Sequence, residues 1–84
     1  MKSSALAAMS APVFKNLDVR PLLAQGIEPL AEIRARLDAL SAGQGLTVIA
    51  PFLPAPLIEL LRSEGYSASI ERRGEGWAAH FWRD

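Results

Sequence analysis

The sequence predicts an α/β (α+β) two-layer sandwich, in which a four-stranded mixed sheet carries two helices on one face. Apolar residues recur with a period of two in some segments and with a period near 3.6 in others, and the two kinds of segment alternate. The expected order is strand, helix, strand, helix, strand, strand. We expect right-handed crossovers between parallel strands, the spatial order 1-2-4-3, and a last strand antiparallel to the third.

Residues 1–12 are predicted to form a disordered tail before one domain at 13–84. A chain of 84 residues is long enough for one domain, and half of its residues are apolar. The apolar run at 5–9 is shorter than the usual core of a secretory signal, so we expect a cytoplasmic protein. No apolar run approaches the length of a membrane span, and we expect no membrane partner.

The first strand is expected at 13–19, where Leu17 and Val19 alternate with polar residues. Pro21 prevents further strand pairing on its N–H side. We therefore expect a tight loop from Pro21 to Glu28.

The first helix is expected from Pro29 to about Ala42, because proline is tolerated in the first turn of a helix. Gly43 suits the left-handed position that ends a helix. The apolar stripe consists of Leu30, Ile33, Leu37 and Leu40. Opposite-charge pairs on the other face are Glu32 with Arg36 and Arg34 with Asp38.

The second strand is expected at 46–50, and its nearly continuous apolar character favours a central position in the sheet. Three prolines in the segment 51–56 end this strand. A second helix then runs to Glu64, with Gly65 as its C-terminal cap. Its inward residues are expected to be Leu57, Leu60 and Leu61.

A hairpin is predicted at the end of the chain, with its turn at 73–76. On the strand before the turn, Tyr66, Ala68 and Ile70 alternate with polar residues. After the turn, residues 77, 79 and 81 are expected to face the helices. His80 and Trp82 then face the open side of the sheet.

The composition excludes several kinds of chemistry. The chain has no cysteine, which removes disulfides, thiolate catalysis, persulfide carriage and cysteine-based metal sites. A single histidine rules out a multi-histidine metal site within one chain. Nine basic residues balance nine acidic ones, so the cationic excess of a general nucleic-acid binder is missing. We expect no catalytic residues, no metal, no cofactor and no nucleic-acid partner.

The loop end of the domain contains three candidate binding residues. Asp18 and Arg20 leave the first strand on the same side, either as a local ion pair or with Arg20 in a small pocket beside Glu28 and Phe52. Glu28 precedes a helix N-terminus, where a carboxylate is favourable, and its alternative role is contact with a ligand or partner. That carboxylate also repels the anions that a bare helix end attracts.

Three aromatic residues complete the candidate site. Phe52 is either a staple over the second helix or an exposed anchor for a partner. His80 is either a solvated surface residue or a ligand that needs partners from another chain. Trp82 is either covered by the tail or by its neighbours, or part of an apolar patch on the open sheet face that favours association.

The strand motif Leu17-Asp18-Val19-Arg20 and the helix entry Gly26 … Glu28-Pro29-Leu30, with the order of the elements, resemble the TusA/SirA-like (sulfur-carrier) superfamily. The resemblance covers residues 17–83. That family's pattern has a Leu-Asp-x-Arg strand and a Cys-Pro-x-Pro helix start, whose cysteine carries a persulfide. This chain keeps Pro29, but the position of the cysteine falls at Glu28 or Gly26. Sulfur transfer by this chain alone is therefore excluded.

A closer resemblance is to a cysteine-less, uncharacterised branch of that superfamily. Its motifs are present here as Asp-x-Arg-Pro at 18–21, Gly-x-Glu-Pro at 26–29 and Pro-Phe-x-Pro-x-Pro-Leu at 51–57. Members of the branch are often joined to hemerythrin-like or cupin-like domains. The resemblance therefore implies a TusA-like domain that works beside such proteins.

We expect a non-enzymatic protein-interaction or regulatory module that binds a partner, or itself. The contact surface would be the open sheet face or the loop end near Glu28. The alternative is a small-molecule-binding protein or weak enzyme, in which Arg20 and Glu28 orient a polar ligand against Phe52 and Glu28 acts as a base.

A third hypothesis is single-stranded nucleic-acid binding by stacking on Trp82. It requires help from three arginines, and the zero net charge disfavours it. The arginines concerned are Arg72, Arg73 and Arg83.

Overall fold

The structure is a computed structural model that describes residues 12–83. The tail predicted at 1–12 lies, except for Pro12, outside the described residues. The strands are β1 (Val13–Asp18), β2 (Gln44–Ala50), β3 (Ser67–Arg73) and β4 (Gly76–Trp82). The helices are α2 (Arg20–Ala24), α3 (Leu30–Asp38) and α4 (Ala55–Ser63). In the described part of the chain, no helix is long and apolar enough to span a bilayer.

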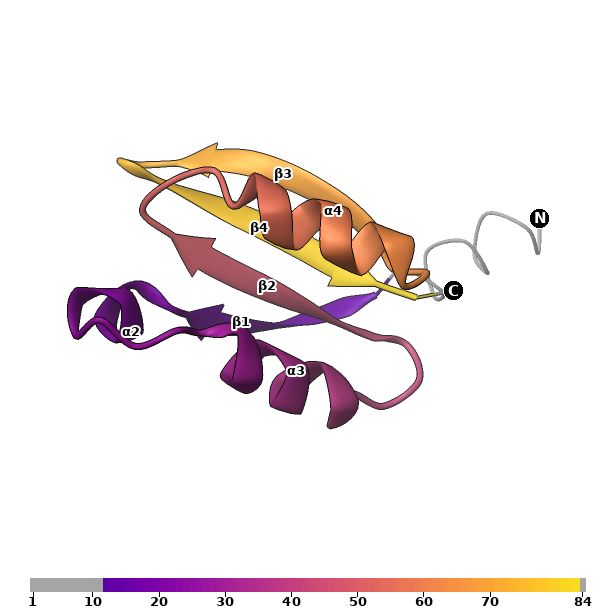
Figure 1. The fold of residues 1–84 in the computed structure, drawn as a ribbon. Helices are drawn as coiled ribbons and strands as arrows, with labels where there is room; N and C mark the ends of the chain where they lie inside the picture. Colours follow the sequence, from indigo (N-terminus) through magenta and orange to yellow (C-terminus); the bar gives the residue numbers. More distant parts are fainter. Residues whose placement is uncertain (1–11, 84) are drawn as a thin grey trace.

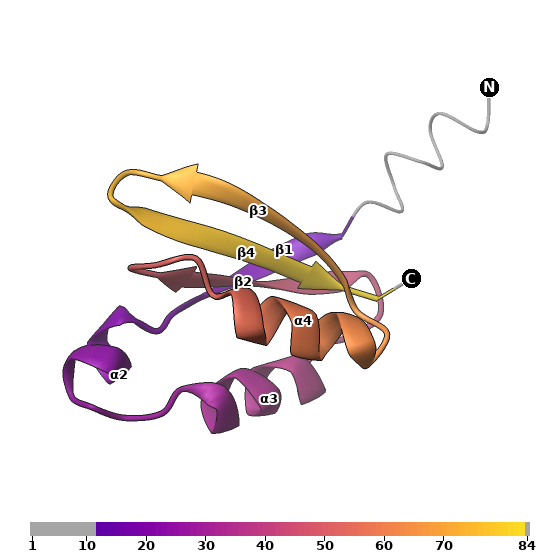
Figure 2. The same ribbon diagram turned by 45° about the horizontal axis from the view of Figure 1, so that its top comes forward.

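The sheet has the predicted order β1-β2-β4-β3. β1 and β2 are parallel, and β4 runs antiparallel to both of its neighbours. Figures 1 and 2 show α3 and α4 side by side on one face of this sheet, while α2 lies beyond the end of β1. The predicted two-layer architecture with a mixed sheet is confirmed.

The core fills the space between the sheet and the two long helices. Val48 and Phe81 lie on the helix-facing side of the central strands, and Ile33 and Leu61 cover them from α3 and α4. The other buried members of this cluster are Leu17, Val19, Leu37, Leu46, Ala50, Ile58 and Ala79. The face of the sheet that the alternating pattern of apolar residues predicted to contact the helices is therefore the buried face.

Residues 20–24 form the short helix α2, where the sequence predicted a loop, so this prediction was wrong. Pro21 fits because it lies in the first turn, where its missing N–H has no acceptor within the helix. The helix ends with its C-cap residue Gln25, whose N–H donates to the carbonyl oxygens of Pro21 and Leu22. Gly26 follows with a φ of 73°.

Helix α3 ends at Asp38, four residues before the predicted end at Ala42. The chain leaves the helix because the N–H of Leu40 bonds to the carbonyl of Leu37, which turns Leu40 towards the core. The side chain of Gln44 then accepts a hydrogen bond from the N–H of Ser41 at 2.8 Å. Gly43, with a φ of 81°, belongs to this turn rather than to the helix end.

The inward face of α4 differs slightly from the prediction. Leu61 is buried as expected, but Ile58 is the second buried residue, whereas Leu57 and Leu60 are only half-buried. Gly65 follows the C-cap with a φ of 97°, as predicted.

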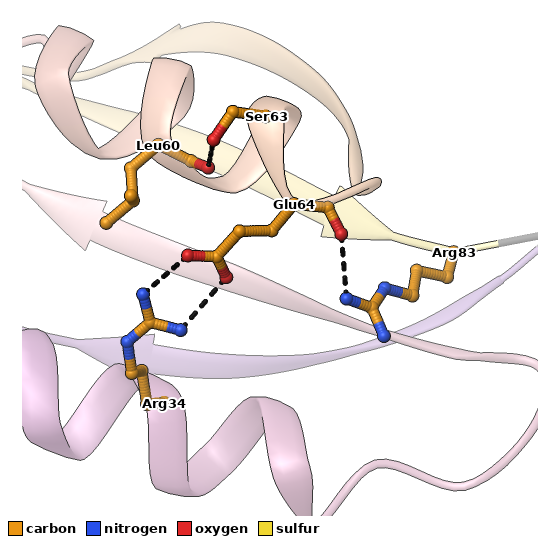
Figure 3. Close-up of polar contacts among 5 residues, drawn as sticks. All are labelled: Arg34, Leu60, Ser63, Glu64 and Arg83. Atoms are coloured by element: carbon orange, nitrogen blue, oxygen red, sulfur yellow. Dashed lines mark hydrogen bonds and ion pairs between the residues drawn. The ribbon is translucent and has the colours of Figure 1, made fainter.

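Arg34 links the two long helices through Glu64 (Figure 3). Its Nη1 and Nη2 atoms donate to the two carboxylate oxygens of Glu64 at 2.9 and 2.7 Å. The sequence predicted Asp38 as the partner of Arg34, and the hydrogen bonds go instead to Glu64. The backbone carbonyl of Glu64 also accepts a hydrogen bond from Arg83 at 2.9 Å. The other predicted pair, Glu32 with Arg36, is present at 2.9 Å.

The hydrogen bonds from Arg34 hold the pKa of Glu64 below its usual value. The stabilisation from this shift is therefore complete above the unfolded-state pKa and is lost as pH falls through the folded-state pKa. We expect Glu64→Gln to lower the urea midpoint at pH 7, by a small amount because the pair is partly exposed. The difference from wild type should shrink towards pH 3.

Urea unfolding at a series of pH values measures this effect. Glu59→Gln, on an exposed position of α4, is the control and should leave the urea midpoint at pH 7 nearly unchanged. A Glu64→Gln profile parallel to that of wild type down to pH 3 would show that the pair does not contribute.

Candidate functional site

A cleft of about 310 Å³ opens between α3 and α4, at the end of the sheet where β1 and β2 finish. Val48 and Ala50 of β2, together with Val19 after β1, form its floor. The side walls come from the two helices and the segments before them. Their apolar side chains are Leu23, Leu30, Ile33, Leu57 and Leu60.

The entrance of the cleft is apolar. Pro29 and Pro56 line it, and so does Phe52, which is 54% exposed. Pro54 also lines the cleft but is buried. Two further exposed apolar residues adjoin the lining in sequence. They are Ile27, at 45% exposure, and Leu53, at 40%. Phe52 is thus an exposed aromatic residue in the lining of an apolar cleft.

Glu28 is the only charged residue among the described residues that line the cleft. Its Oε1 atom accepts a hydrogen bond from the backbone N–H of Leu30 at 3.0 Å. The carboxylate therefore satisfies one of the free N–H groups at the start of α3, as the favourable electrostatics of that position predicted.

Asp18 and Arg20 form a local ion pair outside the cleft. The Nε and Nη2 atoms of Arg20 donate to the two oxygens of Asp18 at 2.9 and 2.7 Å. These hydrogen bonds hold the pKa of Asp18 below its usual value. The predicted ion pair is confirmed. Of the three residues expected to share a pocket, Glu28 and Phe52 line the cleft and Arg20 does not.

His80 lies on the open face of the sheet, as predicted, and connects three strands. Its Nδ1 atom is 2.7 Å from Oγ1 of Thr47 on β2, and its Nε2 atom is 2.8 Å from Oε1 of Glu71 on β3. Hydrogen bonds from His80 and then Arg73 hold the pKa of Glu71 below its usual value. An ionised Glu71 only accepts, so Nε2 donates and, in a neutral imidazole, Nδ1 accepts from the Thr47 hydroxyl.

This hydroxyl–imidazole–carboxylate chain has the order of a catalytic triad, but its hydroxyl is inaccessible. Thr47 is 1% exposed, so a substrate cannot reach its oxygen. Both ring nitrogens of His80 are already hydrogen-bonded. Residues 12–83 contain no group of three or more acidic or histidine side chains suited to a metal ion. The chain of hydrogen bonds therefore ties β2, β4 and β3 together.

Trp82 is partly covered by Phe14 of β1. The two rings meet edge to face with centroids 5.9 Å apart, and the ring of Phe14 also contacts His80 at 5.3 Å. Phe14 reaches across β2 because its partner in the register is Gly45, which has no side chain in the way. A neighbouring residue, Phe14, thus provides cover for Trp82.

The sequence interpretation missed the partners of His80 and Trp82. Thr47 and His80 share a face by the period of two, and the hairpin register brings Glu71 within reach of His80. These signals were available. No comparable pattern in the sequence indicated that Pro56 and Leu57 line a cleft, because their positions depend on how α4 is rotated against the sheet.

The chain was compared with models of known protein families. The model of a family described as "uncharacterized conserved protein (DUF2249)" matches residues 16–83. No curated protein and no solved structure gives a significant match. The matched region includes every residue of the cleft.

Proposed function

The chain belongs to the DUF2249 family of uncharacterised conserved proteins, and we propose that it is a non-enzymatic module that binds a protein partner through the cleft between α3 and α4. The observation that carries this proposal is the gathering of exposed apolar side chains at the cleft. Phe52 is exposed beside an almost wholly apolar lining, and Ile27 and Leu53, which adjoin lining residues in the sequence, are exposed as well. Exposed apolar patches next to a hollow are typical of interaction surfaces.

A protein partner fits this surface better than a polar small molecule. Small-molecule sites use several converging polar groups, whereas Glu28 is the one charged group among the described lining residues. Arg20, the second group that a polar ligand would need, donates both side-chain hydrogen bonds to Asp18. The exposed apolar rim also extends the contact surface beyond the cleft itself.

We also propose that the family is a cysteine-less branch of the TusA/SirA-like superfamily. The strand order β1-β2-β4-β3, with two helices on one face, supports this relation. The motifs at 18–21, 26–29 and 51–57 point the same way and make hemerythrin-like and cupin-like proteins the first candidate partners. A cytoplasmic location, expected from the sequence, is also part of this proposal.

Phe52→Ser is expected to weaken partner binding about tenfold or more, because it removes the exposed aromatic ring that lines the cleft. Binding of the purified chain to candidate hemerythrin-like and cupin-like domains is measured by biolayer interferometry. Ile70→Ser is the matched control, since Ile70 is an exposed apolar residue, at 46%, on β3. Equal loss in both variants, or no binding to any candidate by a chain that stays monomeric in light scattering, would contradict the proposal.

A further inference from the structure

We infer that the cleft selects a basic amphipathic segment of its partner, with an apolar side chain that enters the cleft and a lysine or arginine that meets Glu28. This inference rests on the proposed function and specifies the partner's chemistry.

The charge at the entrance is negative. One carboxylate oxygen of Glu28 accepts the hydrogen bond from Leu30, and the described residues offer no hydrogen bond to the other, Oε2. The full negative charge of the carboxylate exceeds the roughly half positive charge of the end of α3. The nearby Asp18 and Arg20 neutralise each other.

Docking changes the environment of Glu28. An apolar segment laid over the entrance removes water from a carboxylate that stands among Pro29, Phe52 and Leu30. An ionised group that loses water without a partner is strongly destabilised. A cationic side chain on the segment restores a partner through a charge-assisted hydrogen bond. An acidic side chain would add repulsion to the loss of water.

The same argument disfavours a second copy of this chain as the occupant. In a two-fold dimer through the cleft, each copy presents the same surface to the other. The two Glu28 carboxylates would then approach each other across an apolar interface. The two cations nearest to Glu28 in the sequence are already paired, Arg34 with Glu64 and Arg20 with Asp18. The partner is therefore a different protein.

Selection from a random library of displayed peptides on the immobilised full chain tests the inference. We expect the enriched peptides to carry an aromatic or large aliphatic residue with a lysine or arginine within one helical turn. Synthetic copies are then titrated by fluorescence anisotropy. Glu28→Gln should weaken their binding about tenfold, the loss of one hydrogen bond to a charged group. Because glutamine keeps an oxygen for the N–H of Leu30, this variant retains the cap.

Two further variants sharpen the test. Selection on Glu28→Lys should enrich acidic instead of basic residues beside the apolar anchor. Glu59→Gln removes an exposed carboxylate from α4 outside the cleft and should leave the affinities unchanged.

The outcomes separate the two proposals. Peptides that need Phe52 but show no basic preference, or that bind Glu28→Gln as tightly as wild type, would overturn the inference and leave the proposed function standing. Failure to enrich any peptide whose binding depends on Phe52 would overturn both. A concentration-dependent dimer that Phe52→Ser dissociates would identify a second copy as the occupant and would also overturn the inference.

Discussion

Phe81→Ala is expected to lower the free energy of unfolding by about 3–5 kcal/mol, the usual range for removing a buried aromatic ring. Phe81 is 0% exposed and lies on β4, where it pairs with Leu46 on the central strand β2. A chain of 84 residues has a total stability of roughly 4–12 kcal/mol. The substitution therefore removes a large share of the stability, and the variant should unfold at a much lower urea concentration than wild type.

Urea and thermal unfolding followed by circular dichroism measure this loss. Ile70→Ala is the control, because its side chain is 46% exposed and its loss should change stability by no more than about 0.5 kcal/mol. A loss below about 1 kcal/mol for Phe81→Ala would mean that the ring is not packed in the core as described.

Gly45→Ala is expected to destabilise the fold by about 1–3 kcal/mol through overpacking. A Cβ atom at this position would lie 2.5 Å from Cε1 of Phe14 and 2.8 Å from the carbonyl oxygen of Phe81. Neither distance is compatible with van der Waals contact, so the ring of Phe14 must move away from position 45 and lose its contacts with the rings of His80 and Trp82.

A double-mutant cycle with Phe14→Ala separates the two contacts. In the Phe14→Ala background, Gly45→Ala should cost less than in wild type, because only the contact with the carbonyl oxygen of Phe81 remains. The same cost in both backgrounds would show that Phe14 does not lie over Gly45.

The strand order could be predicted because the sequence of each strand fits its environment. Residues 46–50 are almost wholly apolar, which requires cover on both faces and a central position. The hairpin strands alternate, which gives them one buried and one open face. Helix α2 was not predicted because Pro21 is compatible with two local structures. A proline ends strand pairing, and it also fits the first turn of a helix. Local sequence does not distinguish these two effects.

The candidate site was predictable only in part. Parallel neighbours place the ends of β1 and β2 together, so Glu28 and Phe52 could be assigned to one end of the sheet. Partners on two different helices could not be assigned. Arg34 has an acidic residue one helical turn away, yet it bonds to Glu64, thirty residues further on. Helical spacing identifies neighbours on one helix and does not reveal how two helices approach each other.

The three prolines of the cleft affect how a partner would bind. The rings of Pro29, Pro54 and Pro56 fix the φ angles of both helix entries, so these walls have little conformational freedom to lose. A preorganised surface of this kind loses little conformational entropy on association. Most of the conformational entropy lost on binding is therefore lost by the partner's segment. The heat-capacity change on binding should therefore scale with the apolar area that is covered, without a contribution from folding of the loops of this domain.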